Sequence, residues 1–120
     1  MIFVGTDIVF IPRIEKLIDK KGDIFLNHLF TKIEQDICNN KSVPAVHYSG
    51  KIAAKEAVKK AILSSTPLIK ISLRSIEIQN REDGAPIVNV HKKGFNLKNV
   101  NVSISHTENY ATATAVIELK

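Results

Sequence analysis

The sequence has a single cysteine, no tryptophan and no long apolar run. One cysteine, Cys38, excludes an internal disulfide framework and a cysteine-rich zinc site. No segment approaches the roughly 18 consecutive apolar residues that a membrane-spanning helix needs. The first residues lack the basic region of a secretory signal peptide, and an acid follows already at Asp7. We therefore expect an intracellular, cytoplasmic protein.

Several catalytic and metal-binding patterns are also missing. The five glycines do not form a phosphate-loop or dinucleotide-binding pattern. His28, His47 and His91 have no metal-ligand spacing between them. Ser105 and His106 are adjacent in a predicted strand, so their side chains point to opposite faces and do not indicate a catalytic triad. The sequence therefore gives no sign of a nucleotide loop, a histidine metal centre or a serine hydrolase.

The chain carries clustered positive charge, and its length suits a single domain. Its 120 residues, 44% of them hydrophobic, are enough for one core, and we expect residues 1–120 to form a single domain. The net charge is +5. Residues 41–60 hold five lysines against one glutamate, and residues 91–101 hold three lysines and no acid. The excess charge suggests an anionic partner, such as nucleic acid, a phosphorylated metabolite, an acidic protein or a membrane surface, and a merely soluble surface is the alternative.

The first half of the chain has helical periodicity after one β-branched segment. Residues 2–11 predict a strand that carries an acid in its middle. Pro12 suits the first turn of a helix, and Thr31 with Glu34 forms a capping box that predicts a helix with Ile33 and Ile37 facing inward. Further helices are predicted near residues 24–29 and from Pro44 to about residue 63.

The second half alternates with the period of a strand. Alternating segments are predicted at residues 75–79, 86–90, 100–105 and 111–118, with turns at 81–84 and near 107–109. A strand, then helices, then hairpins predict an α+β fold, in which an antiparallel sheet packs against a long helix and shorter N-terminal helices.

The long helix carries the most informative charges. Its apolar face is formed by Ala53, Ala54, Ala57, Val58, Ala61 and Ile62. Lys51, Lys55 and Lys59 form a basic ridge on one flank, while Glu56 and Lys60 lie on the other. Spacing alone favours a surface ion pair between Glu56 and Lys60, and a solvated lysine ridge.

Asp7 lies inside an apolar strand, where burial is costly without a compensating partner. A metal ion or a basic group would compensate its charge, and the alternative is a strand end exposed to solvent. Gly5 permits close approach of another backbone. An aspartate and a glutamate near basic groups form the oxygen-rich arrangement that Mg²⁺ and phosphates require.

Four motifs, taken in order, resemble the holo-acyl-carrier-protein synthases, the small bacterial group of the 4′-phosphopantetheinyl transferase superfamily. They are Gly5-Thr6-Asp7-Ile8, Lys55-Glu56-Ala57, Gly84-Ala85-Pro86 and Ser103-Ile104-Ser105-His106-Thr107. The resemblance covers nearly the whole chain. It implies the fold of that superfamily and transfer of 4′-phosphopantetheine from coenzyme A to a serine of apo-acyl carrier protein. Adenosine 3′,5′-bisphosphate would be released, with Mg²⁺ as cofactor, in fatty acid biosynthesis.

The resemblance also implies roles for individual residues. Asp7 and Glu56 match acidic metal ligands, and Lys60 matches a lysine near the transferred phosphate. Arg13 matches an arginine that contacts the acidic carrier protein. The expected coenzyme A contacts are Gly84, Pro86, His106 and Thr107. The basic ridge adds Lys51 and Lys55 to this set. Similar enzymes are homotrimers with active sites between subunits.

Three positions depart from the family pattern. Gly50-Lys51-Ile52 stands where Gly-Arg-Phe is usual, and lysine keeps the charge without the bidentate fork of arginine. Leu63-Ser64-Ser65 replaces a common Gly-Thr-Gly, and His28 replaces an arginine near the expected carrier surface.

Two other functions are consistent with the charge. The first is a nucleic-acid-binding module, which predicts aromatic residues among the basic ones. The chain has five phenylalanines and two tyrosines, and residues 49–65 contain none of them. The second is a subunit that binds coenzyme A or a carrier protein without catalysis.

Overall fold

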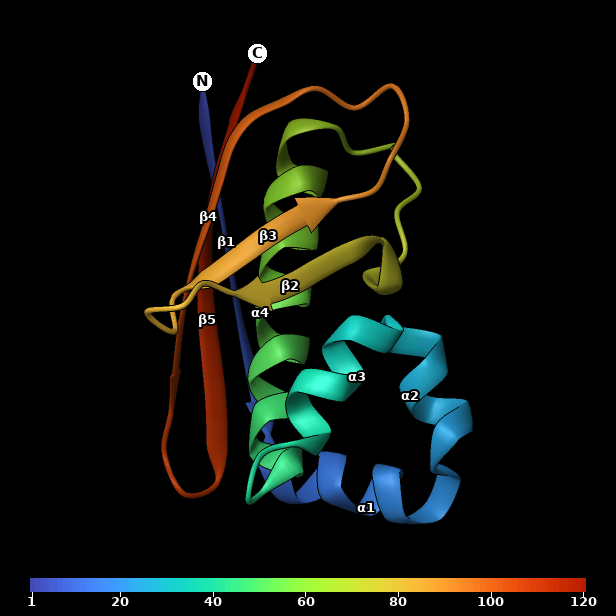
Figure 1. Cartoon of the computed structure of the whole chain (residues 1–120). Coiled ribbons are helices and arrows are strands. Elements are labelled where there is room, and N and C mark those ends of the chain that lie inside the picture. The colour runs from blue at the N-terminus through green and yellow to red at the C-terminus, as the bar shows by residue number, and fades with distance from the viewer.

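The computed structural model describes residues 1–120 as four helices and five strands (Figure 1). The elements in chain order are β1 (Ile2–Phe10), α1 (Ile11–Lys21), α2 (Asp23–Leu29), α3 (Lys32–Asn39), α4 (Pro44–Ser65), a 3₁₀ turn (Leu73–Ser75), β2 (Ile76–Asn80), β3 (Pro86–Val90), β4 (Leu97–His106) and β5 (Tyr110–Leu119). The predicted α+β class is confirmed, and every predicted element is present with ends that differ by a few residues at most.

The strands form two antiparallel sheets around α4. The larger sheet has the order β1-β5-β4, and β2 pairs with β3 in a separate hairpin. In Figure 1 α4 runs between them, with the larger sheet on one side, the hairpin on another, and α1 to α3 gathered at one end. The first strand of the chain thus pairs with the last, so the two termini lie close together (Figure 1).

The core lies along α4. Ala53, Ala54, Ala57 and Ala61 have no exposed surface, and they let the larger sheet approach the helix closely. Gly5 of β1 makes the closest approach: a Cβ atom there would come within 1.9 Å of the Ala57 carbonyl oxygen. Only glycine fits this position, because any side chain would push the strand off the helix.

The N-terminal helices follow the predicted caps with one correction. Thr31 and Glu34 form the predicted capping box at the start of α3. The prediction that Ile33 faces inward is wrong: Ile33 is 49% exposed, and α3 buries Glu34 and Cys38 instead. Glu34 can be buried because the buried Lys55 pairs with its charge. Hydrophobic periodicity does not reveal this pairing.

The larger sheet has one covered and one open face. Alternation directs Ala111, Ala113, Ala115 and Ile117 of β5 toward α4. The opposite face leaves apolar side chains of β1 and β5 exposed, namely Ile2, Val4, Ile8, Phe10, Tyr110 and Val116.

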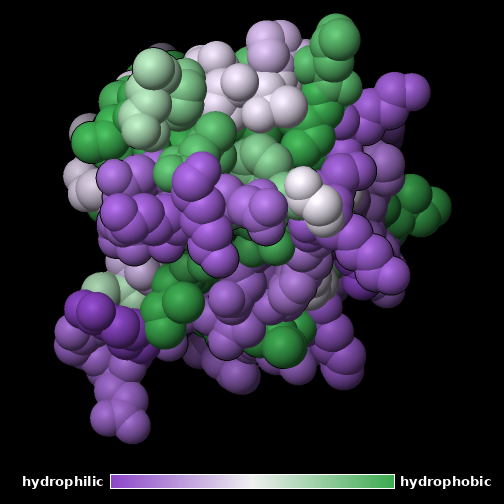
Figure 2. Space-filling view, turned by 90° about the horizontal axis from the view of Figure 1, so that it is seen from above, coloured by the Kyte–Doolittle hydropathy of each residue, from purple (hydrophilic) through white to green (hydrophobic).

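The rest of the surface is mixed. The end of the molecule that holds both termini shows hydrophilic residues over most of its area and hydrophobic ones gathered toward one edge (Figure 2). None of the helices combines the length and apolar character needed to cross a membrane.

Candidate active site

Asp7, Glu56 and Arg13 line one pocket of about 260 Å³. The pocket lies where β1 ends, α1 begins and α4 passes beneath them, and Ile52 of α4 forms part of its apolar wall. The two predicted carboxylates are therefore brought together from residues 49 positions apart in the chain.

The local structure explains why Asp7 points into this pocket. Side chains alternate along β1, so Asp7 shares the helix-facing side of the strand with Gly5 and Val9. The close contact of Gly5 with Ala57 holds the strand against α4 next to Glu56 and about one turn before Lys60. The side chain of Asp7 is only 17% exposed, so its charge needs a partner.

Lys60 is that partner. Its Nζ donates to Asp7 Oδ1 at 3.0 Å and to the Thr6 carbonyl oxygen at 3.0 Å. The surface ion pair that spacing favoured between Glu56 and Lys60 is absent. An ammonium group has three protons, so one N–H of Lys60 stays available at this partly exposed site.

Glu56 is half-buried and forms no ion pair within the chain. Its carboxylate and the second oxygen of Asp7 are the oxygen ligands that this pocket offers to a cation. No cluster of three or more histidine, cysteine, aspartate or glutamate side chains occurs in the structure. A metal ion held here would thus have two protein carboxylates at most, and the rest of its ligands would come from water or a bound substrate.

A second, larger pocket of about 470 Å³ lies on the other side of α4, where the helix faces β4 and the β2–β3 turn. It contains four of the predicted ligand contacts: Lys51, Gly84, Pro86 and His106. They come from three separate elements: α4, the β2–β3 hairpin and the end of β4. Lys51 and Glu56 are five residues apart on α4, which turns their side chains about 140° away from each other, so the two pockets open on different sides of the helix.

The second pocket is strongly basic. Its charged lining comprises Lys41, Lys51 and Arg81 with a single acid, Glu82, and the titratable His47 and His106. The sequence analysis did not assign Lys41, His47 and Arg81 to the site. Lys41 was visible as part of the basic cluster of residues 41–60, whereas Arg81 was interpreted only as a turn residue.

Two lysines of the basic ridge on α4, Lys51 and Lys55, are buried, whereas the spacing in the sequence favoured a solvated ridge. Lys51 is 6% exposed and Lys55 is fully buried. Lys51 donates to the Ile78 carbonyl oxygen at 2.9 Å and to Asn80 Oδ1 at 3.4 Å, which leaves one proton for a ligand in the larger pocket. Burial lowers the pKa of Lys51.

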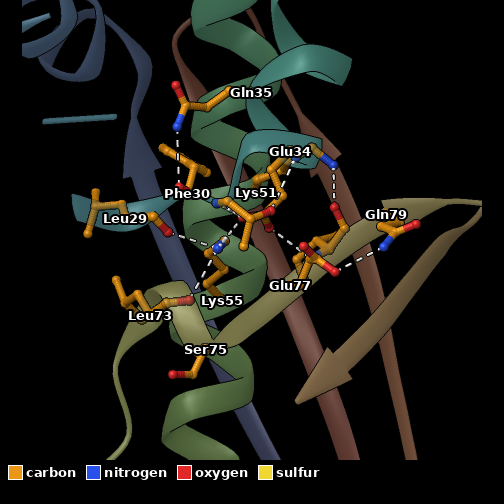
Figure 3. Close-up of polar contacts among 12 residues, drawn as sticks. Leu29, Phe30, Glu34, Gln35, Lys51, Lys55, Leu73, Ser75, Glu77 and Gln79 are labelled. Carbon is orange, nitrogen blue, oxygen red and sulfur yellow. Dashed lines mark hydrogen bonds and ion pairs between the residues drawn. The ribbon is translucent and has the colours of Figure 1, made fainter. Parts of the chain in front are cut away.

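Lys55 has no proton left for a ligand, and its predicted contact with coenzyme A is corrected. Its Nζ donates to Glu34 Oε1 at 2.6 Å and to the carbonyl oxygens of Leu29 and Leu73 at 2.8 and 3.1 Å (Figure 3). Glu34 Oε2 in turn accepts from the Ile78 amide at 2.7 Å. Burial lowers the pKa of Lys55, although the Glu34 charge opposes this shift. Lys55 therefore joins α2, α3 and the β2 region to α4.

The remaining predicted residues lie near the site or at its margin. Thr107 is outside the lining of the larger pocket, and its Oγ1 accepts from the amides of Asn109 and Tyr110 in the β4–β5 turn. Arg13 is exposed on α1 and borders the carboxylate pocket. His28 is exposed in the last turn of α2.

A carboxylate pocket and a separate cation-lined pocket on the same helix suit a protein that acts on a phosphate-bearing ligand. Comparison with known proteins agrees. The profile of the 4′-phosphopantetheinyl transferase superfamily matches residues 3–115. The chain belongs to this superfamily and, within it, to the holo-[acyl-carrier-protein] synthases.

The relatives cover almost the whole chain. The holo-[acyl-carrier-protein] synthase of Protochlamydia amoebophila is 43% identical over 116 residues, which is 94% of each chain. That of Thermodesulfovibrio yellowstonii is 42% identical over 95% of this chain and 96% of its own. The solved Helicobacter pylori enzyme in complex with coenzyme A is 31% identical, with a TM-score of 0.84 over 96% of this chain and 99% of its own.

Proposed function

We propose that this chain transfers 4′-phosphopantetheine from coenzyme A to a serine hydroxyl of apo-acyl carrier protein and releases adenosine 3′,5′-bisphosphate. The observation that carries the proposal is the carboxylate pocket, in which Asp7, held by Lys60, lies together with Glu56. The names of the relatives and the coenzyme A complex of the Helicobacter pylori enzyme support it.

The basic pocket suits the phosphorylated nucleotide end of coenzyme A. Lys41, Lys51 and Arg81 line it with a single acid, Glu82, although Arg81 also pairs with Asp83 Oδ2 at 2.8 Å. Gly84 has a φ of +88° and no atom near a Cβ position, so the β2–β3 turn presents open backbone at the pocket. These groups would bind and orient the ligand, and its pyrophosphate would reach the carboxylate pocket of a neighbouring subunit in the proposed assembly.

Lys60 is placed to act on the reacting phosphate. Because Asp7 and the Thr6 carbonyl hold its ammonium group, it is already oriented before the ligand arrives, and its remaining N–H is available to a phosphate oxygen. In phosphoryl transfer the charge on the phosphate oxygens and on the leaving phosphate must be stabilised, and a fixed cation provides this without reorganisation.

Asp7 and Glu56 fit a magnesium ion. Mg²⁺ prefers oxygen ligands and is commonly held by one or two carboxylates together with substrate phosphates, which is the donor set of this pocket. When bound, the ion would neutralise pyrophosphate charge and polarise the phosphorus atom. Asp7 would have to share its carboxylate between Lys60 and the ion through its two oxygens.

The second substrate is an acidic carrier protein. Arg13 is exposed at the rim of the carboxylate pocket, and the basic residues Lys16, Lys20 and Lys21 follow on the same helix. A carrier that docks on this side of α1 would bring its serine to the carboxylates, and the net charge of +5 would steer it. The nucleic-acid alternative has no support from the relatives.

We assign this reaction to fatty acid biosynthesis in the cytoplasm. The buried free thiol of Cys38, whose pKa is raised by burial to about 11, is compatible with a reducing compartment because it stays protonated and unreactive.

The direct test is to incubate the protein with coenzyme A, apo-acyl carrier protein and Mg²⁺ and to weigh the intact carrier. We expect the carrier to gain the mass of one phosphopantetheine, EDTA to abolish the gain, and added salt to slow it because charge screening weakens both encounters. A carrier of unchanged mass would contradict the proposal. Binding of coenzyme A without mass gain would instead indicate a non-catalytic subunit.

The open face of the larger sheet supports a homotrimer with active sites between subunits. Val4 is 54% exposed and pairs across the sheet with Val116, which is 39% exposed, so two apolar side chains meet in solvent at the centre of this face. Burial of such a face is favourable by about 25 cal/mol per Å² of apolar surface.

The oligomeric state can be measured by light scattering after size exclusion. We expect three times the 13.3 kDa of one chain. Val4→Lys should lower the mass to that of one chain, because it places a charge in the buried interface. The matched control is Leu68→Lys, at a side chain that is 94% exposed in the loop after α4, and it should leave the mass unchanged. A wild-type mass of one chain would contradict the trimer.

A further inference from the structure

His47 lies in the basic pocket, and the sequence analysis set it aside. It stands in the second turn of α4 and faces the pocket together with His106 of β4. The charged groups that face it are Lys41 from the segment before α4, Lys51 from α4, and Arg81 and Glu82 from the β2–β3 turn. His47 is therefore an ionisable group among cations, at the place where a phosphate-bearing ligand would bind.

The free protein disfavours the charged form of His47. His47 is exposed to solvent on one side, yet desolvation by its surroundings lowers the pKa of this imidazole, and the positive charges of Lys41, His106 and Lys51 lower it further. The pKa therefore lies below the ordinary value of 6.5, so the imidazole is neutral at pH 7. A neutral imidazole in this position still has one nitrogen that can donate and one that can accept a proton.

We propose that His47 binds the phosphate-bearing part of coenzyme A and takes up a proton when the ligand arrives. The inference rests on the proposed function, because it needs coenzyme A as the ligand of this pocket. A phosphate brings negative charge next to the imidazole and accepts hydrogen bonds from both nitrogens of the charged form. The negative charge of the ligand thus offsets the positive charges that keep His47 neutral in the free protein.

The direction of the pH dependence follows from this coupling. If the ligand complex binds more protons than the free protein, the affinity falls as the pH rises between the free and the bound pKa of His47. The fall is at most about tenfold per pH unit for one proton. The pocket would thus bind coenzyme A more tightly at slightly acidic pH, which a pocket of lysine and arginine alone would not do.

Calorimetric titration with coenzyme A tests the proposal. The number of protons taken up is obtained from binding enthalpies in buffers of different ionisation enthalpy, at several pH values from 6 to 8.5. The second ionisation of the ligand phosphate lies near pH 6, so proton uptake is compared at pH 7.5 and above, where the phosphate is a dianion both in solution and in a pocket of cations. The variants are His47→Gln, His106→Gln and, as the matched control, His28→Gln, whose side chain is exposed on α2 outside the pocket.

We expect His47→Gln to lose most of the proton uptake. It should bind coenzyme A about tenfold more weakly than wild type at pH 6 and almost as well at pH 8.5, because only the charged imidazole adds a charge-assisted hydrogen bond. His28→Gln should behave as wild type. Proton uptake that persists in His47→Gln, or that disappears only in His106→Gln, would overturn the inference while leaving the proposed function intact. Absence of coenzyme A binding in the wild type would overturn both.

Discussion

Replacing Glu56 by glutamine should lower the rate of phosphopantetheine transfer by about 10²- to 10³-fold and raise the Mg²⁺ concentration needed for half-maximal rate. Glutamine keeps the size of the side chain but removes the charge, and an amide is a poorer ligand for a hard cation than a carboxylate. Glu56 has no ion pair within the chain, so its loss should not disturb the fold. The measurement is the initial rate from intact-carrier masses over a range of Mg²⁺ concentrations.

Asp7→Asn should reduce the rate by a similar factor for two reasons. It removes the other carboxylate, and it weakens the hydrogen bond that holds Lys60 at 3.0 Å. The matched control is Asp36→Asn on α3, where the side chain is 61% exposed and forms only a 3.5 Å surface pair with Lys32. A Glu56→Gln variant with wild-type rate and unchanged Mg²⁺ dependence would contradict the metal site.

Lys55→Met should destabilise the protein by about 3–5 kcal/mol. Lys55 is next to Glu56 in the sequence but lies outside the candidate site. The substitution leaves Glu34, whose side chain is 0% exposed, as an uncompensated buried charge. It also leaves the carbonyl oxygens of Leu29 and Leu73 without their donor. The measurement is the free energy of unfolding in urea, by linear extrapolation.

Lys59→Met provides the matched control for this prediction. Lys59 lies on the same helix, is half-exposed and forms no ion pair, so its replacement should change stability by no more than about 0.5 kcal/mol. The double variant Glu34→Gln, Lys55→Met should be more stable than Lys55→Met alone, because no unpaired charge is then buried. Equal effects of Lys55→Met and Lys59→Met would contradict the structural role.

Periodicity and caps were sufficient to predict the elements of this fold. The capping box at Thr31, the proline-led start of α4 and the alternation of β4 and β5 all depend on neighbours within a few residues. Local signals of this kind are visible in sequence because helix and strand periods and cap hydrogen bonds are short-range. The exception was Ile33, which the periodicity placed inward although the helix turns Glu34 to the core.

The candidate site was partly predictable for a different reason. Asp7 and Glu56 were identified from an acid in an apolar strand and from motif order, and the structure brings them to one pocket. Residue type alone did not separate Lys51 and Lys55 from the exposed lysines. A lysine four residues from another has the same pattern whether it faces solvent or a buried glutamate 21 positions away, as Lys55 does.

The sequence by itself determined the class of fold and the positions of the elements, because these depend on local periodicity and on caps. It indicated Asp7 by its place in an apolar strand, whereas Glu56 was predicted as a metal ligand only from the family resemblance. The tertiary structure decided which cations are available to a ligand. Lys60 keeps one free proton beside Asp7, Lys51 keeps one in the basic pocket, and Lys55 keeps none. The reason is that hydrogen-bond partners and burial are set by residues distant in sequence, and only folding brings Glu34 and the β2–β3 turn to α4.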